Sequence, residues 1–295
     1  MLPSHITQAL ADGGLAEAHV LDVINRALDE DLQWGDDVTT RATIPADAEG
    51  TADVVARASG TLAGVPVAAA VAHVLAARHG ETVESEIVAA DCSRVESGQR
   101  VLTVRGRVAT LLTAERTLLN LVSQLSGVAT ATAAWADALR GTDCAVRDTR
   151  KTVPGLRVLQ KYAVRCGGGV NHRMGLGDAA LIKDNHVLAA GSVTAAFQAV
   201  RTQAPEVPVE VECDTLDQVR EAVDAGASLI LLDNMAPDAA RAAVAIAREA
   251  GVATEASGGL TLADAASYAA TGVDYIAVGA LTHSAPVLDL GFDLR

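Results

Sequence analysis

The sequence is poor in aromatic residues. Phe, Trp and Tyr together make up 2% of its 295 residues, so few side chains are present on which the bases of a single-stranded nucleic acid could stack. The net charge of −14 at pH 7 argues in the same direction, because nucleic acids and anionic membranes attract a spread of basic surface. These features exclude both as the main partner, and the 50% apolar composition is typical of a globular enzyme.

Cysteine is scarce, and no targeting segment is evident. The four cysteines, at positions 92, 144, 166 and 213, have no CxxC spacing and are too few for a disulfide framework. We therefore expect buried thiols in a reducing compartment, the cytoplasm. The first residues lack the charged start and long apolar core of a secretory signal. The uncharged stretch 58–77 contains Pro66 and favours a turn followed by a buried helix over a membrane span.

The first part of the chain has a mixed α and β pattern. Apolar residues at helical spacing predict an amphipathic helix over 18–30, and a buried helix is expected from Pro66. Residues 109–139 lack proline and predict two helices separated at Gly127, which would bridge two domains. Strands are expected at 51–59, 82–90 and 100–108.

After Thr142 short apolar runs alternate with helical segments, which predicts parallel strands joined by right-handed crossovers. Helices are expected at 214–226, 237–251 and 260–272. The strands are expected at 144–149, 179–185, 207–213, 228–234, 252–257 and 275–281. Their nearly regular spacing favours an α/β barrel over an open sheet, with six clear strands instead of eight.

Positive charge is concentrated between Arg147 and Lys183. This stretch holds eight Lys or Arg against two acids, and it includes all three lysines of the chain. In an α/β barrel the active site lies at the C-terminal ends of the strands, where Arg150, Lys151 and Lys183 fall. Because clustered like charges repel, this grouping favours an anionic ligand with carboxylates or phosphates. A solvated basic face paired with surface acids is the alternative.

Two acids end consecutive predicted strands, Glu212 in VEVEC and Asp233 in ILLDN. Two carboxylates at neighbouring strand ends suit a magnesium ion, which takes one or two protein carboxylates and completes its shell with water and phosphate oxygens. Contacts to ribose hydroxyls, ion pairs with arginines and a structural role are the alternatives.

The segment EASGGLTLADA places glycines between a strand and a helix whose start has Thr261 and Asp264 at capping-box spacing. Backbone N–H groups in such a loop can hold a phosphate at a helix N-terminus, and Gly279 is a candidate second half of this cradle. A plain tight turn is the alternative. The stretch 175–180, GLGDAA, fits GxGxxA but precedes a strand, so we reject dinucleotide binding.

No histidine or cysteine spacing supports a zinc site. His172 stands beside Asn171 and Arg173 and is expected to contact a ligand, whereas His186 could equally be a structural hydrogen-bonding residue.

Several motifs appear in a characteristic order along nearly the whole chain. They are ALDEDLQWGDDVTT at 27–40, AERTLLNLVSQLSG at 114–127, DTRKTVPGLRVLQKYAVRCGGGVNHRMGLGDAALIKDNH at 148–186, VEVEC, ILLDN, EASGG and YIAVGALTH. In this combination they closely resemble the quinolinate phosphoribosyltransferase family, also called nicotinate-nucleotide pyrophosphorylase.

The resemblance implies an α/β fold with an N-terminal α/β sandwich domain and a C-terminal barrel of fewer than eight regular strands. We place the domains at 1–125, with a bridging helix, and 126–295, whose last residues are able to pack back on the first. The implied reaction joins quinolinate to 5-phosphoribosyl 1-diphosphate and yields nicotinate mononucleotide, diphosphate and CO2 for NAD biosynthesis. It uses Mg2+, in a homodimer or larger assembly in which one subunit helps to close the barrel of the other.

The resemblance also implies roles for single residues. Lys183, Glu212 and Asp233 match catalytic positions, the two acids lying near the ribose and the metal. Arg116, on a helix outside the barrel, matches an arginine that reaches across to quinolinate in the other subunit. Residues around the quinolinate carboxylates are matched by Arg150, His172, Arg173 and Lys183, with Thr149 and Lys151 beside them in the substrate-binding set. The phosphate-binding loops are matched by Ser257, Gly258, Gly259, Val278, Gly279 and Ala280.

Two other functions remain alternatives. A pyridine phosphoribosyltransferase that acts on nicotinate without decarboxylation would need cations for only one carboxylate. Here Arg116, Arg150, Arg173 and Lys183 together favour a diacid. A non-catalytic barrel that senses phosphorylated metabolites is disfavoured by the acids at the strand ends. Outside the cations that match family positions, Arg147, Arg157 and Lys161 are undecided between electrostatic support and solvated surface.

Overall fold

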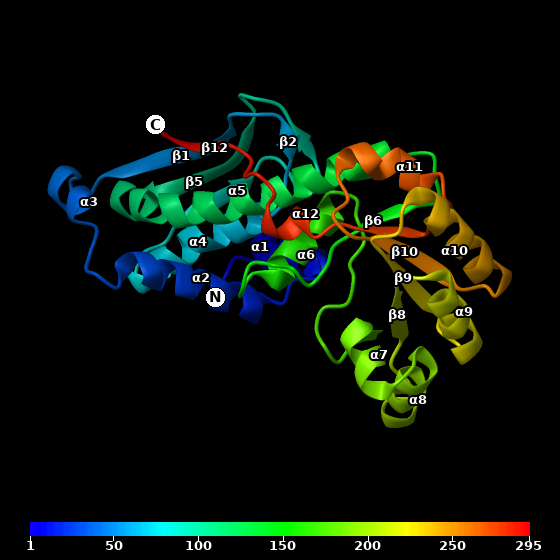
Figure 1. Ribbon diagram of the computed structural model, residues 1–295. Helices are drawn as coiled ribbons and strands as arrows, with labels where there is room; N and C mark the ends of the chain where they lie inside the picture. The colour runs from blue at the N-terminus through cyan, green and yellow to red at the C-terminus, as the bar shows by residue number, and fades with distance from the viewer. The chain divides into compact units, whose positions relative to one another are not determined.

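The computed structural model describes residues 1–295, which divide into two units. The first unit contains Met1–Ala133, Val153–Gly168 and Ser284–Arg295, and the second contains Ala134–Thr152 and Gly169–His283. Figure 1 shows the elements of both units. None of the helices combines the length and the apolar character that a membrane span requires.

The first unit contains an antiparallel sheet of four strands in the order β12-β1-β5-β3. These are β1 (Glu49–Ala56), β3 (Glu84–Ile87), β5 (Arg100–Arg107) and β12 (Leu290–Leu294). The three strands expected here from the sequence are therefore present. The edge strand β12, which no sequence pattern indicated, brings the C-terminus back to pair with β1. A small separate sheet pairs β2 (Gly60–Thr61) with β4 (Arg94–Val95).

Helix α4 (Val65–Arg78) is the centre of this unit. It packs on β3 and β5 and on two further helices, α1 (Ser4–Asp12) and α2 (Glu17–Leu32), which makes an α/β sandwich. Ten of its residues are buried, from Val65 to Ala76, and a proline occupies its first turn. The predicted helices at 18–30 and from Pro66 are confirmed. The unit also contains α3 (Val38–Thr43) and α6 (Arg157–Cys166).

The region expected to form two helices is one continuous helix, α5 (Val108–Ala138), so the predicted break at Gly127 is wrong. Glycine is required there for a different reason. A Cβ on Gly127 would lie 2.8 Å from the Cα of Val287 and would collide with the carbonyl oxygen of Pro286. The residue lets the C-terminal segment approach the helix backbone, and intrahelical hydrogen bonds tolerate it.

The second unit is built on a parallel sheet of six strands, all at the positions expected from the sequence. They are β6 (Ala145–Arg147), β7 (Ala180–Ile182), β8 (Val209–Cys213), β9 (Leu229–Asp233), β10 (Ala253–Ser257) and β11 (Tyr275–Ala277). The helices are α7 (Asp184–Ala190), α8 (Val193–Gln203), α9 (Leu216–Ala225), α10 (Pro237–Glu249), α11 (Ala265–Ala269), α12 (Ala280–His283) and the 3-10 turn η1 (Leu262–Asp264). Figure 1 shows α9 and α10 beside the strands that they connect.

The strand order β6-β11-β10-β9-β8-β7 is that of an incomplete barrel. The first strand, β6, pairs with the last, β11, as it would in a closed barrel. No ladder joins β6 to β7, although they are consecutive strands of this unit. The connection between them contains α6, which belongs to the first unit. This long excursion replaces a simple crossover, and β6 and β7 remain the two edges of the six-stranded sheet.

The cysteines only partly follow the expectation of buried thiols. Cys144, Cys166 and Cys213 are buried, whereas Cys92 is exposed. Its neighbour Asp91 accepts hydrogen bonds from the backbone N–H groups of Gly64 and Val65, at the start of α4. The chain then turns outward, with φ of 68° at Cys92. Asp91 thus caps α4 from the same turn in which Cys92 is exposed.

We expect Gly127→Ala to lower the free energy of unfolding by about 1–3 kcal/mol, because the methyl group meets backbone atoms that cannot move aside. Helix propensity alone would favour alanine by about 1 kcal/mol, so a net loss identifies the contact with the C-terminal segment. Gly177→Ala, where no atom lies within 4 Å of the new Cβ, is the control and should change stability by less than about 0.5 kcal/mol. Urea unfolding measures both, and a stabilised Gly127→Ala protein would contradict the explanation.

Candidate active site

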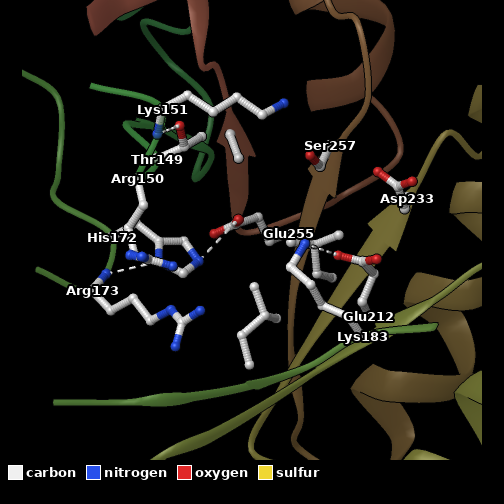
Figure 2. Close-up of a pocket in the computed structure, with 13 residues that line it drawn as sticks. Thr149, Arg150, Lys151, His172, Arg173, Lys183, Glu212, Asp233, Glu255 and Ser257 are labelled. Atoms are coloured by element: carbon white, nitrogen blue, oxygen red, sulfur yellow. Dashed lines mark hydrogen bonds and ion pairs between the residues drawn. The ribbon is translucent and has the colours of Figure 1, made fainter. Parts of the chain in front are cut away.

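A cavity of about 430 Å³ lies at the C-terminal ends of the parallel strands. Because all six strands run in the same direction, the residues that follow them meet at one rim. Nine of the residues singled out in the sequence line the cavity: Thr149, Arg150, Lys151, His172, Arg173, Lys183, Glu212, Asp233 and Ser257. Figure 2 shows Lys151, Arg150 and Arg173 on one side of it and Lys183, Glu212 and Asp233 on the other.

Backbone hydrogen bonds fix the position of Lys151, and its side chain passes close to Gly279. Its N–H donates to the hydroxyl of Thr149 at 3.0 Å, and its carbonyl accepts from the hydroxyl of Thr282 at 2.9 Å. A Cβ on Gly279 would lie 2.9 Å from the Cδ of Lys151. Gly279 therefore makes room for the lysine stem, a role that the sequence did not suggest.

Arg173 lies in a crowded positive environment. Its Nη1 donates to the carbonyl of Ala179 at 2.9 Å. Burial, and after it the charge of Arg150, lower the pKa of the Arg173 guanidinium from its ordinary value. Two guanidinium groups held this close together are favoured when an anion binds between or beside them.

The GLGDAA segment orders the loop that carries Arg173. The carboxylate of Asp178 accepts the backbone N–H groups of Met174 and Gly175 at 2.6 and 2.8 Å. These bonds close a tight turn directly before β7. The segment therefore has a structural role and no dinucleotide-binding context.

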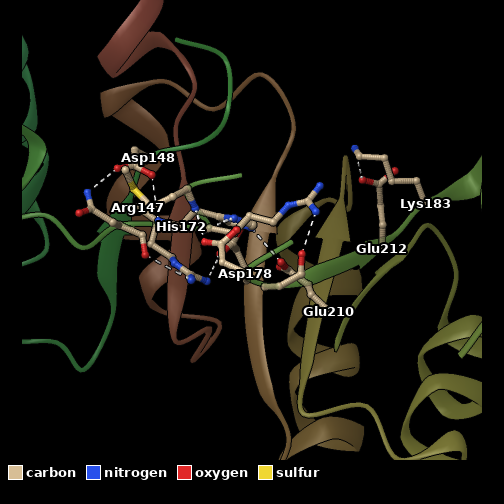
Figure 3. Close-up of polar contacts among 12 residues, drawn as sticks. Arg147, Asp148, His172, Asp178, Lys183, Glu210 and Glu212 are labelled. Carbon is tan, nitrogen blue, oxygen red and sulfur yellow. Dashed lines mark hydrogen bonds and ion pairs between the residues drawn. The ribbon is translucent and has the colours of Figure 1, made fainter. Parts of the chain in front are cut away.

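Lys183 and Glu212 form an ion pair across two neighbouring strands. The Nζ of Lys183 lies 2.8 Å from Oε2 of Glu212, and the lysine side chain is 47% exposed. Figure 3 shows this pair apart from the buried contacts of the barrel interior. The N–H of Lys183 donates to Nδ1 of His186 at 2.9 Å, at the start of α7. His186 is thus a structural hydrogen-bonding residue, one of the two roles left open for it.

Four residues in the barrel interior form what we call the buried cluster: Arg147, His172, Glu210 and Glu255. Nη1 of Arg147 lies 2.6 Å from Oε2 of Glu255, and Nε2 of His172 lies 2.8 Å from Oε2 of Glu210 and 3.6 Å from Oε1 of Glu255. Burial raises the pKa of Glu255 to about 7, and the negative charge of Glu210 adds to the effect. Arg147 therefore serves as electrostatic support and is not a solvated surface residue.

Sequence reasoning missed Glu210 and Glu255. Both stand in the middle of otherwise apolar runs, VEVEC and VATEAS, where an ionisable side chain must enter the barrel interior or be paired. That position was the available signal. The predictions were limited to acids at strand ends, Glu212 and Asp233, because the strand ends form the rim of the barrel.

The loop after β10 has the predicted glycines and capping box, but the helix that follows it is shorter than expected. The capping box is confirmed, since Asp264 accepts from both the N–H and the hydroxyl of Thr261. However, only the turn η1 and the five-residue α11 follow, so no long helix aligns its dipole with this loop. Gly258 and Gly259 have φ values of 108° and 62°, and a Cβ on Gly258 would collide with Asn234. These constraints require glycine independently of any ligand.

The other predicted residues lie outside the cavity lining. Val278 is buried, and its N–H donates to the carbonyl of Arg147 at 2.9 Å, so that N–H is already used. Ala280 begins α12. Arg116 lies on α5 in the first unit, with a side chain that is 67% exposed and 3.9 Å from Glu115. Lys161 is completely buried in the first unit, which excludes the solvated-surface alternative for it.

The fold and the rim together define an α/β barrel enzyme for a small, multiply charged anion. Comparison with known proteins makes this specific. Residues 37–126 match the N-terminal domain, and residues 128–293 the C-terminal domain, of quinolinate phosphoribosyl transferase. The chain belongs to the quinolinate phosphoribosyltransferase family.

Individual relatives cover almost the whole chain. Nicotinate-nucleotide pyrophosphorylase (carboxylating) of Mycobacterium leprae is 55% identical over 275 residues, which are 92% of this chain and 96% of that protein. A probable enzyme of the same name in Bacillus subtilis is 40% identical over 92% of each chain. The structure of the nicotinate-nucleotide pyrophosphorylase from Francisella tularensis superposes with a TM-score of 0.89 and 36% identity, covering 95% of this chain and 98% of that one.

The raised pKa of Glu255 predicts how stability depends on pH. The folded protein keeps this proton up to about pH 7, whereas the unfolded chain releases it near the ordinary value of 4.5. Between these values the unfolded state binds fewer protons, so the free energy of unfolding falls as the pH rises, and the decline ends above about pH 7. Glu255→Gln should flatten this slope in urea unfolding between pH 5 and 8. Glu249→Gln, at the exposed end of α10, should keep it, and an unchanged slope in Glu255→Gln would refute the assignment.

Proposed function

We propose that this protein transfers the phosphoribosyl group of 5-phosphoribosyl 1-diphosphate to quinolinate with loss of CO2. The observation that carries the proposal is the gathering of Arg150, Lys151, Arg173 and Lys183 around one cavity. Three acids, Glu212, Asp233 and Glu255, also line it. The names of its family and relatives state this activity for related proteins. The product is nicotinate mononucleotide, which places the enzyme in NAD biosynthesis.

Quinolinate is a pyridine with two adjacent carboxylates, and the basic side of the cavity suits it. The Arg150 and Arg173 guanidinium groups are planar forks that can bind carboxylates bidentately, while Lys151 acts as a point charge. A substrate with one carboxylate, such as nicotinate, would leave part of this charge unbalanced. The cation provision therefore favours the diacid over the nicotinate-type alternative.

The opposite side of the cavity suits the sugar. Glu212 and Asp233 lie on adjacent strands, β8 and β9, and Ser257 ends β10 beside Asp233. Carboxylates there can accept hydrogen bonds from the ribose hydroxyls and stabilise positive charge that develops on the ribose. The loop at Ser257–Gly259 is the proposed contact for the 5-phosphate.

Mg2+ is the proposed cofactor. Glu212 and Asp233 fit it, because both offer oxygen ligands at the rim, where substrate phosphates and water could complete the shell. The ion-paired state of Glu212 with Lys183 favours contact through water or substrate over direct ligation by both acids. When bound, the ion would neutralise charge on the diphosphate.

The reaction then needs no protein nucleophile. Cations hold the two quinolinate carboxylates so that the ring nitrogen faces the anomeric carbon, and this positioning supplies much of the acceleration. The nitrogen lone pair forms the N–C bond as the C–O bond to diphosphate breaks. The ring becomes a pyridinium, which stabilises the electron pair left on C2 when that carboxylate departs as CO2. A proton from solvent then completes nicotinate mononucleotide.

The decisive assay supplies quinolinate and 5-phosphoribosyl 1-diphosphate and follows CO2 and nicotinate mononucleotide, with nicotinate as the control substrate and EDTA to remove the metal. We expect the protein to turn over quinolinate but not nicotinate, and to do so only when Mg2+ is present. Lys183→Ala should lower kcat/KM by about 100-fold or more without loss of the fold. Arg220→Ala, which removes a cation from the exposed face of α9, should leave it unchanged. Near-normal activity of Lys183→Ala would refute the site assignment.

We further propose a cytoplasmic homodimer, or a larger assembly of dimers, in which Arg116 completes the site of the other subunit. Its exposed side chain is available for such a contact. Arg116→Ala should raise the KM for quinolinate by roughly 10- to 100-fold, the cost of losing a hydrogen bond to a charged group. Mixed dimers of Arg116→Ala and Lys183→Ala chains should regain part of the activity. Absence of complementation in verified mixed dimers would argue against a shared site.

A further inference from the structure

His172 is held at both ring nitrogens by the protein itself. Its Nδ1 accepts the backbone N–H of Arg173 at 2.8 Å, and its Nε2 faces Oε2 of Glu210 at 2.8 Å. Figure 2 shows the bond from Arg173, and Figure 3 shows His172 and Glu210 in one network. A ring nitrogen that accepts a hydrogen bond does so through its lone pair and carries no proton, so the ring proton is on Nε2 and is donated to Glu210.

This arrangement leaves His172 no nitrogen for a ligand. Although it lines the cavity, only its ring carbons remain to contact a substrate. The ring is also neutral, since an imidazolium would carry a proton on Nδ1 as well. The positive charge for the substrate carboxylates must therefore come from the arginines and lysines. In this arrangement neither ring nitrogen of His172 can donate a hydrogen bond to a substrate carboxylate.

Glu210 lies behind His172 in strand β8 and is not part of the cavity lining. It is 5% exposed, and its charge favours the charged form of the Arg173 guanidinium. On the other side of the ring, the backbone N–H of His172 donates to Asp148 at 2.9 Å. The imidazole thus connects strand β8 to the backbone segment that carries Arg173.

We infer that Glu210 is a positioning residue for the proposed reaction: it holds His172 in the tautomer with its proton on Nε2, and His172 in turn holds the backbone of Arg173 at the cavity. The same geometry is common where a carboxylate fixes the orientation of a functional histidine. The kinetic part of this inference rests on the proposed function, whereas the tautomer does not.

The tautomer is tested on the free protein by NMR with 15N-labelled histidine rings. Comparison with His172→Asn assigns the His172 signals among those of the seven histidines. We expect one protonated nitrogen, Nε2, and one unprotonated nitrogen, Nδ1, both before and after addition of quinolinate without the second substrate. Protonation of Nδ1 in either state would overturn the inference.

The kinetic test compares Glu210→Ala, Glu210→Gln and the exposed control Glu249→Ala. Loss of the acceptor should raise the KM for quinolinate about tenfold in Glu210→Ala, because a small displacement of a binding group is costly, with less effect on the KM for 5-phosphoribosyl 1-diphosphate. Glutamine keeps an acceptor oxygen for Nε2 and should restore most of the loss. The control should match the parent protein. An unchanged KM and tautomer in Glu210→Ala would overturn the inference.

The two tests also separate this inference from the proposed function. If the parent protein does not turn over quinolinate, the proposed function fails, while the NMR spectrum of the free protein still decides the tautomer. If Glu210→Ala does not fold, the Glu210→Gln spectrum decides whether an uncharged acceptor is sufficient. Loss of the Nε2 proton signal in folded Glu210→Gln would show that it is not and would overturn the acceptor role.

Discussion

The buried ion pair between Arg147 and Glu255 is the interaction on which the site depends. Nη1 of Arg147 lies 2.6 Å from Oε2 of Glu255 inside the barrel, where the carboxyl group has no exposed surface. Because burial raises the pKa of Glu255 to about 7, the contact is an ion pair above about pH 7 and a hydrogen bond to a neutral carboxyl group below it. A buried pair contributes little net stability, because the cost of removing two charges from water offsets their attraction. Its effect here is to fix positions. Arg147 ends β6 and contacts the ring of Tyr275 in β11, so the pair ties three adjacent strands beneath the cavity.

Around this pair, the acids of the buried cluster lie inside the barrel, and the cations that face the cavity lie at its rim. The buried cluster contains Arg147, His172 and two acids, and the charge of one of these acids, Glu210, attracts the guanidinium of Arg173. Arg150 and Arg173, which repel each other, lie where that attraction acts. An anionic ligand would complete the balance from the solvent side. The acidity of the chain as a whole does not conflict with a basic site, because eight of the 23 Lys and Arg residues lie between Arg147 and Lys183, where only two acids occur.

Much of the fold followed from patterns in the sequence. The six barrel strands and the helices between the later ones have strong local signals, apolar runs separated by capping and turn residues. The features that the sequence patterns missed or misplaced all depend on distant contacts. β12 forms only because β1 offers an edge, and α5 continues through Gly127 because the chain near Pro286 packs against it. Cys92 is exposed in a turn whose preceding residue, Asp91, caps the distant helix α4. Local patterns carry no information about such partners.

The features of the candidate site also divide into those that local sequence patterns predict and those that depend on distant contacts. The sequence by itself determined which residues follow the parallel strands, and the geometry of parallel strands brings such residues to one rim. It also placed the cations in one segment. Only the tertiary structure decided that Glu210 and Glu255 face the barrel interior, that both nitrogens of His172 are engaged, and that Gly279 serves the stem of Lys151. Side-chain direction and burial depend on which strands become neighbours, and the chain acquires those neighbours only when the barrel forms.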